Sequence, residues 1–155
     1  MDEPNALGQV EHLSAKGLYS AALAALDALP LIKSRGITGE VLHVSLLERT
    51  GEHPQAEALA TRLLRSKALT AAQRGTCEFA LGLMLWERGR TDDAIGMFRR
   101  AVDHSRQAGD ARSACWAELR LLISLAGRSQ GPDVATLLSQ VRHNVTMLGE
   151  PTLSA

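Results

Sequence analysis

The chain of 155 residues falls within the usual size of one domain and is long enough to bury a hydrophobic core. Its 17 basic and 17 acidic residues cancel, so no net charge favours nucleic acid or an anionic membrane as the primary partner. The apolar residues are mainly Leu and Ala, aromatic residues make up 3%, and two cysteines are too few for a disulfide-bonded scaffold. This composition favours helices over strands.

The N-terminal residues and the apolar runs give no sign of secretion or of a membrane span. The acidic start, Met1 to Pro4, is not followed by the apolar segment of a signal peptide. The longest weakly charged stretch, residues 18–32, is interrupted by Asp27 and broken by Pro30, and it is shorter than the roughly 20 residues that a bilayer needs. We therefore expect a cytoplasmic protein with no membrane partner.

Apolar spacing, read together with helix start and stop residues, predicts eight helices and no strand. In chain order we expect helices at about residues 6–16, 19–29, 38–49, 54–64, 70–88, 91–102, 110–127 and 131–148. Residues 70–73 (Thr-Ala-Ala-Gln) have the form of a capping box at the start of the fifth helix. Thr91 is expected to cap the sixth helix through its hydroxyl, and Asp92 and Asp93 suit the positive end of the helix dipole.

Glycines after alternate helices recur at spacings of 34, 38 and 38 residues, at Gly17, Gly51, Gly89 and Gly127. A period in this range is typical of an array of helical repeats. We expect a single repeat domain over residues 1–155, with repeats at about 3–36, 37–74, 75–112 and 113–149 and a possible further repeat beginning at 150–155. Solenoids normally close with a polar capping helix, so the chain is expected to be part of a longer protein or to pair with a second copy through this end.

The best repeat resembles the tetratricopeptide repeat. Its matches to the family's Leu-Gly, aromatic, Gly, Ala, aromatic and Ala positions are Leu81-Gly82, Leu85, Gly89, Ala94, Phe98 and Ala101. In the following repeat Trp116 and Leu119 match, whereas Arg120 stands where a small residue is expected; the first two repeats match less well. The resemblance implies a right-handed α-solenoid of about four antiparallel helix pairs, in which Gly82 and other small residues lie where paired helices touch.

The resemblance also implies a concave groove lined by the first helix of each pair. The groove residues that it implies are Thr76, Phe79, Leu83, Trp86 and Glu87, with Val41, Ser45 and Arg49 from the preceding repeat and Ala117 and Leu121 from the following one. An apolar floor of this kind suits an amphipathic helix or a hydrophobic peptide. The alternative is that Phe79 and Trp86 only pack against neighbouring repeats. The clamp with which some family members hold an acidic C-terminal peptide is absent from the matching positions.

No residue pattern predicts catalysis, a metal or a cofactor. The five histidines lack metal-ligand spacing, and the sequence contains no phosphate-binding loop, nucleophile elbow or dinucleotide-binding turn. Cys77 and Cys115 lie 38 residues apart, one full repeat, so we expect them at equivalent positions of adjacent helices, too distant for a disulfide. Two buried thiols are the better interpretation.

The sequence thus favours a non-enzymatic scaffold that binds a protein or peptide partner in its groove. A second hypothesis is a sensory or regulatory segment of a larger bacterial signalling protein or transcription regulator, for which the junction at residues 108–110 (Ala-Gly-Asp) is typical. A third is a self-assembly module that forms a homo-oligomer through its C-terminal end. Basic residues in the middle of the chain are expected on solvated second helices, so nucleic-acid binding is disfavoured.

Overall fold

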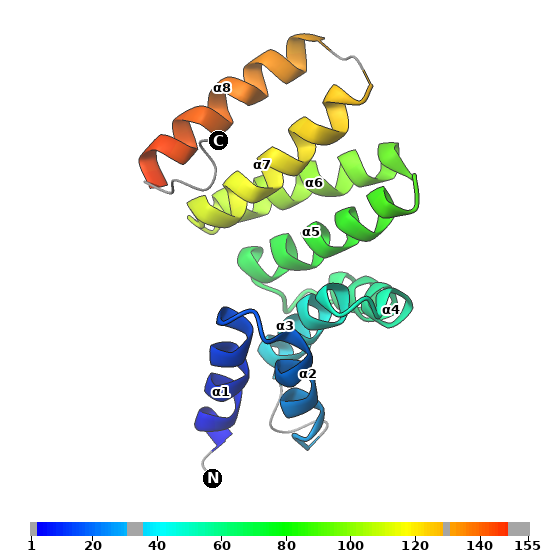
Figure 1. The fold of residues 1–155 in the computed structure, drawn as a ribbon, viewed down its shortest axis with the longest axis vertical. Coiled ribbons are helices and arrows are strands. Elements are labelled where there is room, and N and C mark those ends of the chain that lie inside the picture. Colours follow the sequence, from blue (N-terminus) through cyan, green and yellow to red (C-terminus); the bar gives the residue numbers. More distant parts are fainter. Residues whose placement is uncertain (1–2, 31–35, 129–130, 149–155) are drawn as a thin grey trace. The chain divides into compact units, whose positions relative to one another are not determined.

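The computed structural model describes residues 3–30, 36–128 and 131–148, and within these ranges all regular secondary structure is helical (Figure 1). The helices are α1 (Glu3–Ala15), α2 (Tyr19–Asp27), α3 (Gly36–Arg49), α4 (His53–Leu64), α5 (Ala71–Glu87), α6 (Thr91–Gln107), α7 (Ala111–Ala126) and α8 (Gly131–Leu148). The all-α class is therefore confirmed for the described ranges, and most helix ends agree with the predicted ones to within a few residues. The predicted start of a further repeat at 150–155 lies outside the described residues.

The chain divides into two compact units, residues 1–69 and 70–155, and each is described by itself. In the N-terminal unit α1 packs against α2, α2 against α3 and α3 against α4. Its core contains Val10, Ala22, Leu26 and Leu46, which α1, α2 and α3 contribute. Leu and Ala dominate this core because the larger side chains fill the space that the small ones leave between close helices.

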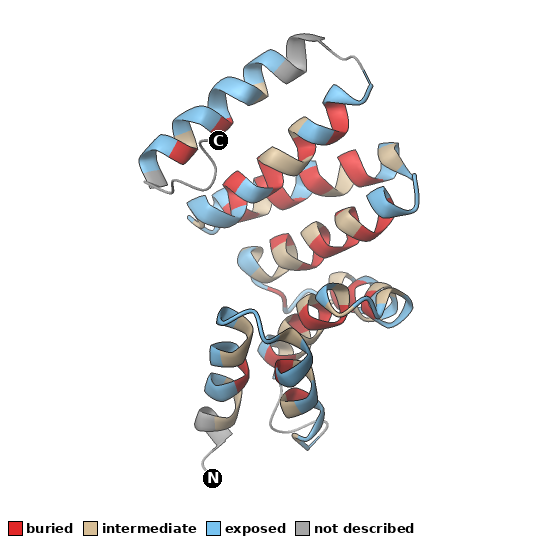
Figure 2. Cartoon of the chain, in the orientation of Figure 1, coloured by how far each residue is buried: buried red, intermediate tan, exposed pale blue. Residues whose placement is uncertain are grey.

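In the C-terminal unit each helix packs against the next one along the chain, and α5 also contacts α7 directly. One core cluster joins α5, α6 and α7 through Leu85, Ala94, Ile95, Phe98, Leu121 and Leu125. Figure 2 shows buried positions alternating with intermediate ones along α5 and with exposed ones along α6, as expected for helices that cover a shared core. α7 therefore has neighbours on three sides, α5, α6 and α8.

Tight turns connect several of the helices, and each uses a glycine with a positive φ followed by one shared residue. After α5, Gly89 has φ +74°, a conformation that side chains with a Cβ rarely adopt. The amide of the next residue, Arg90, donates to the Leu85 carbonyl, and the Arg90 carbonyl accepts from Ala94 in the following helix. Arg90 therefore ends one helix and begins the next. The same turn occurs at Gly17, Gly51 and Gly109.

This turn explains one wrong prediction about helix starts. The residue after the glycine must be the N-cap, so Arg90 takes that position, without a side-chain cap bond, and Thr91 is already the first helical residue. The hydroxyl cap assigned to Thr91 was therefore wrong by one residue. Asp92 and Asp93 do lie in the first turn of α6, as predicted. The capping box at residues 70–73 is confirmed, with both of its hydrogen bonds present.

The predicted contact of small residues between α5 and α6 is also confirmed. A Cβ added at Gly82 would lie 2.5 Å from Cε1 of the Phe98 ring, so only glycine lets the two helices approach this closely. Ala94 and Ala101 on α6 are fully buried. The Phe98 ring is held from a second side by Phe79, whose centroid lies 5.9 Å away.

The offset between the two helix pairs of the C-terminal unit is 40 residues, not the 38 read from the glycines. α5 and α7 begin at Ala71 and Ala111, and α6 and α8 begin at Thr91 and Gly131. Gly127 is the C-cap residue of α7 with ordinary helical geometry, so it does not occupy the position that Gly89 occupies after α5. Because a helix turns about 100° per residue, an error of two residues rotates an inferred position by about 200°.

Candidate protein-binding surface

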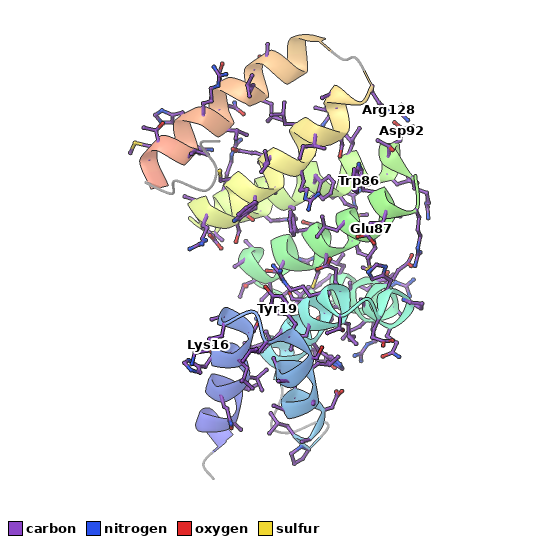
Figure 3. The ribbon with its side chains drawn as sticks, in the orientation of Figure 1. Lys16, Tyr19, Trp86, Glu87, Asp92 and Arg128 are labelled. Atoms are coloured by element: carbon purple, nitrogen blue, oxygen red, sulfur yellow. The ribbon has the colours of Figure 1, made fainter. Side chains whose placement is uncertain are left out.

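The α5 residues predicted to line a groove do share one side of that helix, but they differ in exposure. Thr76, Phe79, Leu83 and Trp86 recur every three or four residues, which places them in one stripe. Phe79 and Leu83 are half-buried and pack against the α5–α6–α7 core cluster. Trp86 is 39% exposed, near the end of the helix (Figure 3). The open part of the stripe is therefore its C-terminal end.

The other two α5 residues of the prediction are polar. The Thr76 hydroxyl donates to the Ala72 carbonyl of its own helix at 3.1 Å. Glu87 is exposed and follows Leu83 by four residues, so it lies on the same side of the helix, about 100° from Trp86 around the helix. Trp86 and Leu83 are the apolar α5 residues best placed to meet a ligand, and Glu87 lies at the edge of that surface.

On α7 the sequence-based assignment selected the wrong face. Ala117 and Leu121 are buried, Ala117 against Ala101 and Val102 and Leu121 within the core cluster with Phe98. They are core residues and do not line an open groove. The error follows from the 38-residue offset, which rotated the assignment to the opposite side of the helix.

With the 40-residue offset, the α7 positions that correspond to Thr76, Ala80 and Leu83 of α5 are those of Trp116, Arg120 and Ile123. These three residues share one side of α7 at spacings of four and three. Trp116 is 38% exposed, Ile123 is 43% exposed and Arg120 is half-buried. Sequence reasoning had noted Trp116 and Arg120 only as a match and a departure from the family pattern, and the corrected offset is the signal that would have found all three.

A direct contact joins this side of α7 to Trp86 of α5. The Arg120 guanidinium carbon lies 5.9 Å from the centroid of the Trp86 ring, which is a cation–π geometry. We define the α5–α7 surface as Leu83 and Trp86 of α5 with Trp116, Arg120 and Ile123 of α7. It combines two exposed tryptophans, two aliphatic side chains and one cation on two helices that a buried core holds in place.

The N-terminal residues of the predicted groove lie on α3 and have different environments. Val41 is buried and therefore belongs to the core, which contradicts its assignment to a groove. Ser45 is half-buried. Arg49 is exposed; it donates to the Tyr19 hydroxyl at 3.0 Å and lies 4.7 Å from the centroid of the Tyr19 ring, so it joins α3 to α2.

Two buried carboxylates in the C-terminal unit were missed by the sequence analysis. The Glu78 carboxylate of α5 forms a hydrogen bond with the His104 ring, in which Oε2 lies 2.6 Å from Nδ1. Glu118 of α7 is fully buried and accepts hydrogen bonds from Arg106 and, at 2.6 Å, from Nδ2 of Asn144. Each carboxylate therefore bonds to a residue 26 positions later in the next helix, and this repeated spacing was the available signal. Burial of an unpaired charge is costly, so each carboxylate stabilises the fold only while the neighbouring helices hold its partners in place. We therefore assign both groups to the contacts between helices.

The cysteines are buried and are not linked by a disulfide, as predicted. Burial raises the pKa of the Cys77 thiol from 9.0 to about 11, Glu78 adds to the rise and Arg74 opposes it. The Cys77 thiol is therefore protonated at neutral pH and a poor nucleophile. The prediction that the two cysteines are equivalent was wrong, because the 40-residue offset pairs Cys115 with Gly75 instead.

Two hollows are lined in part by α8 and share no lining residue with the α5–α7 surface. One of about 220 Å³ is lined by Arg99, Leu121, Leu125, Thr136, Leu137 and Gln140, and a wider one of about 410 Å³ is lined by Arg106, Ser139, Gln140, His143 and Asn144. Among the described residues, no three His, Cys, Asp or Glu side chains gather in a way that could hold a metal ion.

Comparison with known proteins adds no family or relative. No protein-family model matches the sequence, and no curated protein shows significant similarity to it. None of the helices in the described ranges combines the length and apolar character needed to cross a membrane. Function is therefore inferred from the geometry of the α5–α7 surface.

Proposed function

We propose that the chain is a non-enzymatic protein-interaction scaffold that binds a peptide or helix of a partner protein on the α5–α7 surface. The observation that carries this proposal is the pair of exposed tryptophans, Trp86 and Trp116, on two helices in direct contact. Tryptophan is the residue type most enriched among those that dominate binding energy at protein interfaces. Large apolar side chains that stay exposed on a rigid core often mark such interfaces.

The spacing of the α7 residues favours a helical ligand. Trp116 and Ile123 are seven residues apart, which corresponds to about 10.5 Å along the helix axis. A partner helix laid along α7 would offer its own apolar side chains at the same interval, two turns apart. This is the helix-in-groove mode of recognition, in which side chains at i and i+7 serve as anchors.

The proposal extends to the fold and setting of the chain. We infer a tetratricopeptide-like, right-handed solenoid in a cytoplasmic protein, built from repeated helix pairs. The 40-residue offset between the pairs α5–α6 and α7–α8 supports it, as does the close approach of Gly82 to Phe98. The solenoid interpretation would place the first helices of successive pairs side by side, which is the arrangement that forms a continuous binding face.

The proposal is tested by selecting ligands for the full chain from a random display library of peptides of about 16 residues, some four helical turns. We expect selected peptides to lose at least about tenfold in affinity for Trp116→Ala, because truncation of an interface tryptophan commonly costs more than 2 kcal/mol. Leu138→Ala is the matched control, since Leu138 has similar exposure but lies on α8. Selected peptides that bind both variants as well as the original chain would refute the proposal.

The self-assembly hypothesis is separated from peptide binding by the mass of the chain in solution. Light scattering across a concentration series should give the monomer value of 16.6 kDa. The exposed residues of α8 that the structure describes are mainly polar, such as Ser139, Arg142 and Thr146, but they include Leu138 and Met147, so self-assembly through α8 is tested by this measurement. A dimer that forms with rising concentration and persists in Trp116→Ala would make self-assembly the better function.

A further inference from the structure

Arg120 differs from four other arginines of the chain, which form ion pairs. Arg62, Arg90, Arg106 and Arg128 each contact a carboxylate, and Figure 3 shows Arg128 beside Asp92, which it meets at 2.6 Å. Within the part of the chain that the structure describes, the Arg120 guanidinium contacts no carboxylate and has the Trp86 ring as its partner.

The surroundings of Arg120 make this lack of a carboxylate contact informative. Its side chain is half-buried, and it lies between Trp116, four residues before it, and Ile123, three residues after it. Contact with the Trp86 ring holds the guanidinium in place, so less conformational freedom is lost when it binds an anion. A cation of this kind, flanked by apolar side chains, forms stronger charge-assisted hydrogen bonds than one surrounded by water.

We propose that the occupant of the α5–α7 surface is an acidic amphipathic helix, in which a Glu or Asp side chain pairs with Arg120 between two apolar side chains that contact Trp116 and Ile123. This inference rests on the proposed function and specifies its ligand. In the register that α7 sets, the partner's apolar residues are seven positions apart, and the acid lies three or four positions from the first of them. The guanidinium offers two parallel N–H donors, which match the two oxygens of a carboxylate.

The acid and the apolar residues have separate roles in this complex. The apolar contacts supply most of the affinity, because the tryptophans and Ile123 lose exposed surface on binding. The ion pair fixes the register and excludes helices that carry a Lys or Arg at the same position, since two like charges would then meet without water between them. An acidic helix therefore binds in one register, while an uncharged one could slide along α7.

The same display selection tests this inference when it is run in parallel on the original chain, on Arg120→Met and on Arg120→Lys. Arg120→Met keeps the apolar stem of the side chain and removes the charge, and Arg120→Lys keeps the charge and removes the planar fork. We expect Glu and Asp to be enriched at one position between two apolar residues in peptides selected on the original chain. This enrichment should vanish on Arg120→Met and persist, more weakly, on Arg120→Lys. Thermal unfolding shows that the variants keep their fold.

A double-mutant cycle makes the result quantitative. Replacing the enriched acid of the best peptide by its amide should lower affinity by about tenfold for the original chain and leave affinity for Arg120→Met nearly unchanged. Peptides that depend on Trp116 but show no preference for an acid would overturn this inference and leave the proposed function intact. Peptides that bind independently of Trp116 would overturn both.

Discussion

The two units of the chain are built from the same kind of helix pair but differ in how those helices are secured. The helices of the N-terminal unit have 13, 9, 14 and 12 residues, and those of the C-terminal unit have 17, 17, 16 and 18. In the N-terminal unit α2 and α4 begin without a side-chain cap, whereas in the C-terminal unit α5 and α7 begin with one and α6 does not. The ion pair between α3 and α4 is exposed, while Glu118 is buried.

The two units differ in how far the local features of the sequence agree with the contacts between helices. In the C-terminal unit the caps, the small residues at helix contacts and the buried hydrogen bonds all favour the same arrangement, and agreement of this kind is what stabilises a single native state. The N-terminal unit relies more on its Leu and Ala core. We therefore expect the C-terminal unit to be the more stable of the two, and the α5–α7 surface lies within it.

The largest expected effect comes from emptying the core on which the α5–α7 surface rests. Phe98→Ala removes a fully buried ring and should destabilise the C-terminal unit by about 3–5 kcal/mol. Both tryptophans of the chain, Trp86 and Trp116, lie in this unit, so urea unfolding followed by tryptophan fluorescence reports on it selectively. We expect the fluorescence midpoint to fall sharply.

The matched variant in the N-terminal unit is Leu26→Ala, which truncates a fully buried side chain of α2. Its cost of about 2–5 kcal/mol should appear as faster amide hydrogen exchange in α1, α2 and α3. The tryptophan fluorescence transition should change little. If Leu26→Ala shifted that transition as far as Phe98→Ala does, the two units would unfold together and the proposed difference in their stability would have no meaning.

The next effect concerns two of the ion pairs that join consecutive helices, Glu118 with Arg106 and Glu40 with Arg62. Glu118→Gln replaces a buried carboxylate that bonds to Arg106 and Asn144, and we expect a loss of about 2 kcal/mol. The figure stays below that of a fully buried pair because Arg106 is 47% exposed and water screens its charge. Amide exchange in α7 and α8 measures the change.

The control is Glu40→Gln, which breaks the exposed pair with Arg62 and should cost no more than about 0.5 kcal/mol. Added salt should weaken the effect of this control further and leave that of Glu118→Gln nearly unchanged. Equal losses for the two variants would show that burial of Glu118 adds nothing to the C-terminal unit.

Sequence reasoning could predict the helices because their ends carry local chemistry. The capping box at residues 70–73, the glycine turn at Gly89 and the cap Asp110 each act through neighbours a few residues away, so they are visible without the fold. The contact at Gly82 was predictable because glycine inside a helix costs stability, and close packing against a second helix commonly offsets that cost. These features determined the all-α class and most helix boundaries.

The face that each helix buries was harder to predict, because it depends on the exact number of residues between equivalent positions of successive repeats. Gly127 resembles the other stop glycines in sequence, yet it is the C-cap itself, and α7 is one residue shorter than α5. The resulting error of two residues exchanged the exposed Trp116 and Ile123 and the half-buried Arg120 for the buried Ala117 and Leu121. The buried Glu118 could not be distinguished from a solvated glutamate, since its partners come from two other helices. Features that arise only when helices meet thus remained outside sequence reasoning.

A smaller effect tests the close contact between α5 and α6. Gly82→Ala adds a methyl group that would lie within 2.5 Å of the Phe98 ring, so α5 must move away from α6. Overpacking costs about 1–3 kcal/mol, and the better helix propensity of Ala returns part of it, so we expect a net loss of about 1–2 kcal/mol in the fluorescence transition. Gly96→Ala is the control, because no atom lies within 4 Å of its added Cβ. That variant should be neutral or stabilising.

The smallest effect comes from the residue shared between two helices in a glycine turn, which both units contain. Asp110 accepts hydrogen bonds there from the amide, at 3.0 Å, and the hydroxyl of Ser113, whereas Glu52 makes no side-chain cap bond in the equivalent turn. Asp110→Ala should therefore cost about 1 kcal/mol, and Glu52→Asp, which places a shorter carboxylate within reach of the amide three residues on, should add about half as much to the N-terminal unit. Amide exchange in α7 and α4 measures the two changes. A loss of stability in Glu52→Asp would mean that the backbone of the turn at Gly51 does not allow a side-chain cap. The stability of the N-terminal unit would then be limited by the geometry of this turn and not only by the residue at position 52.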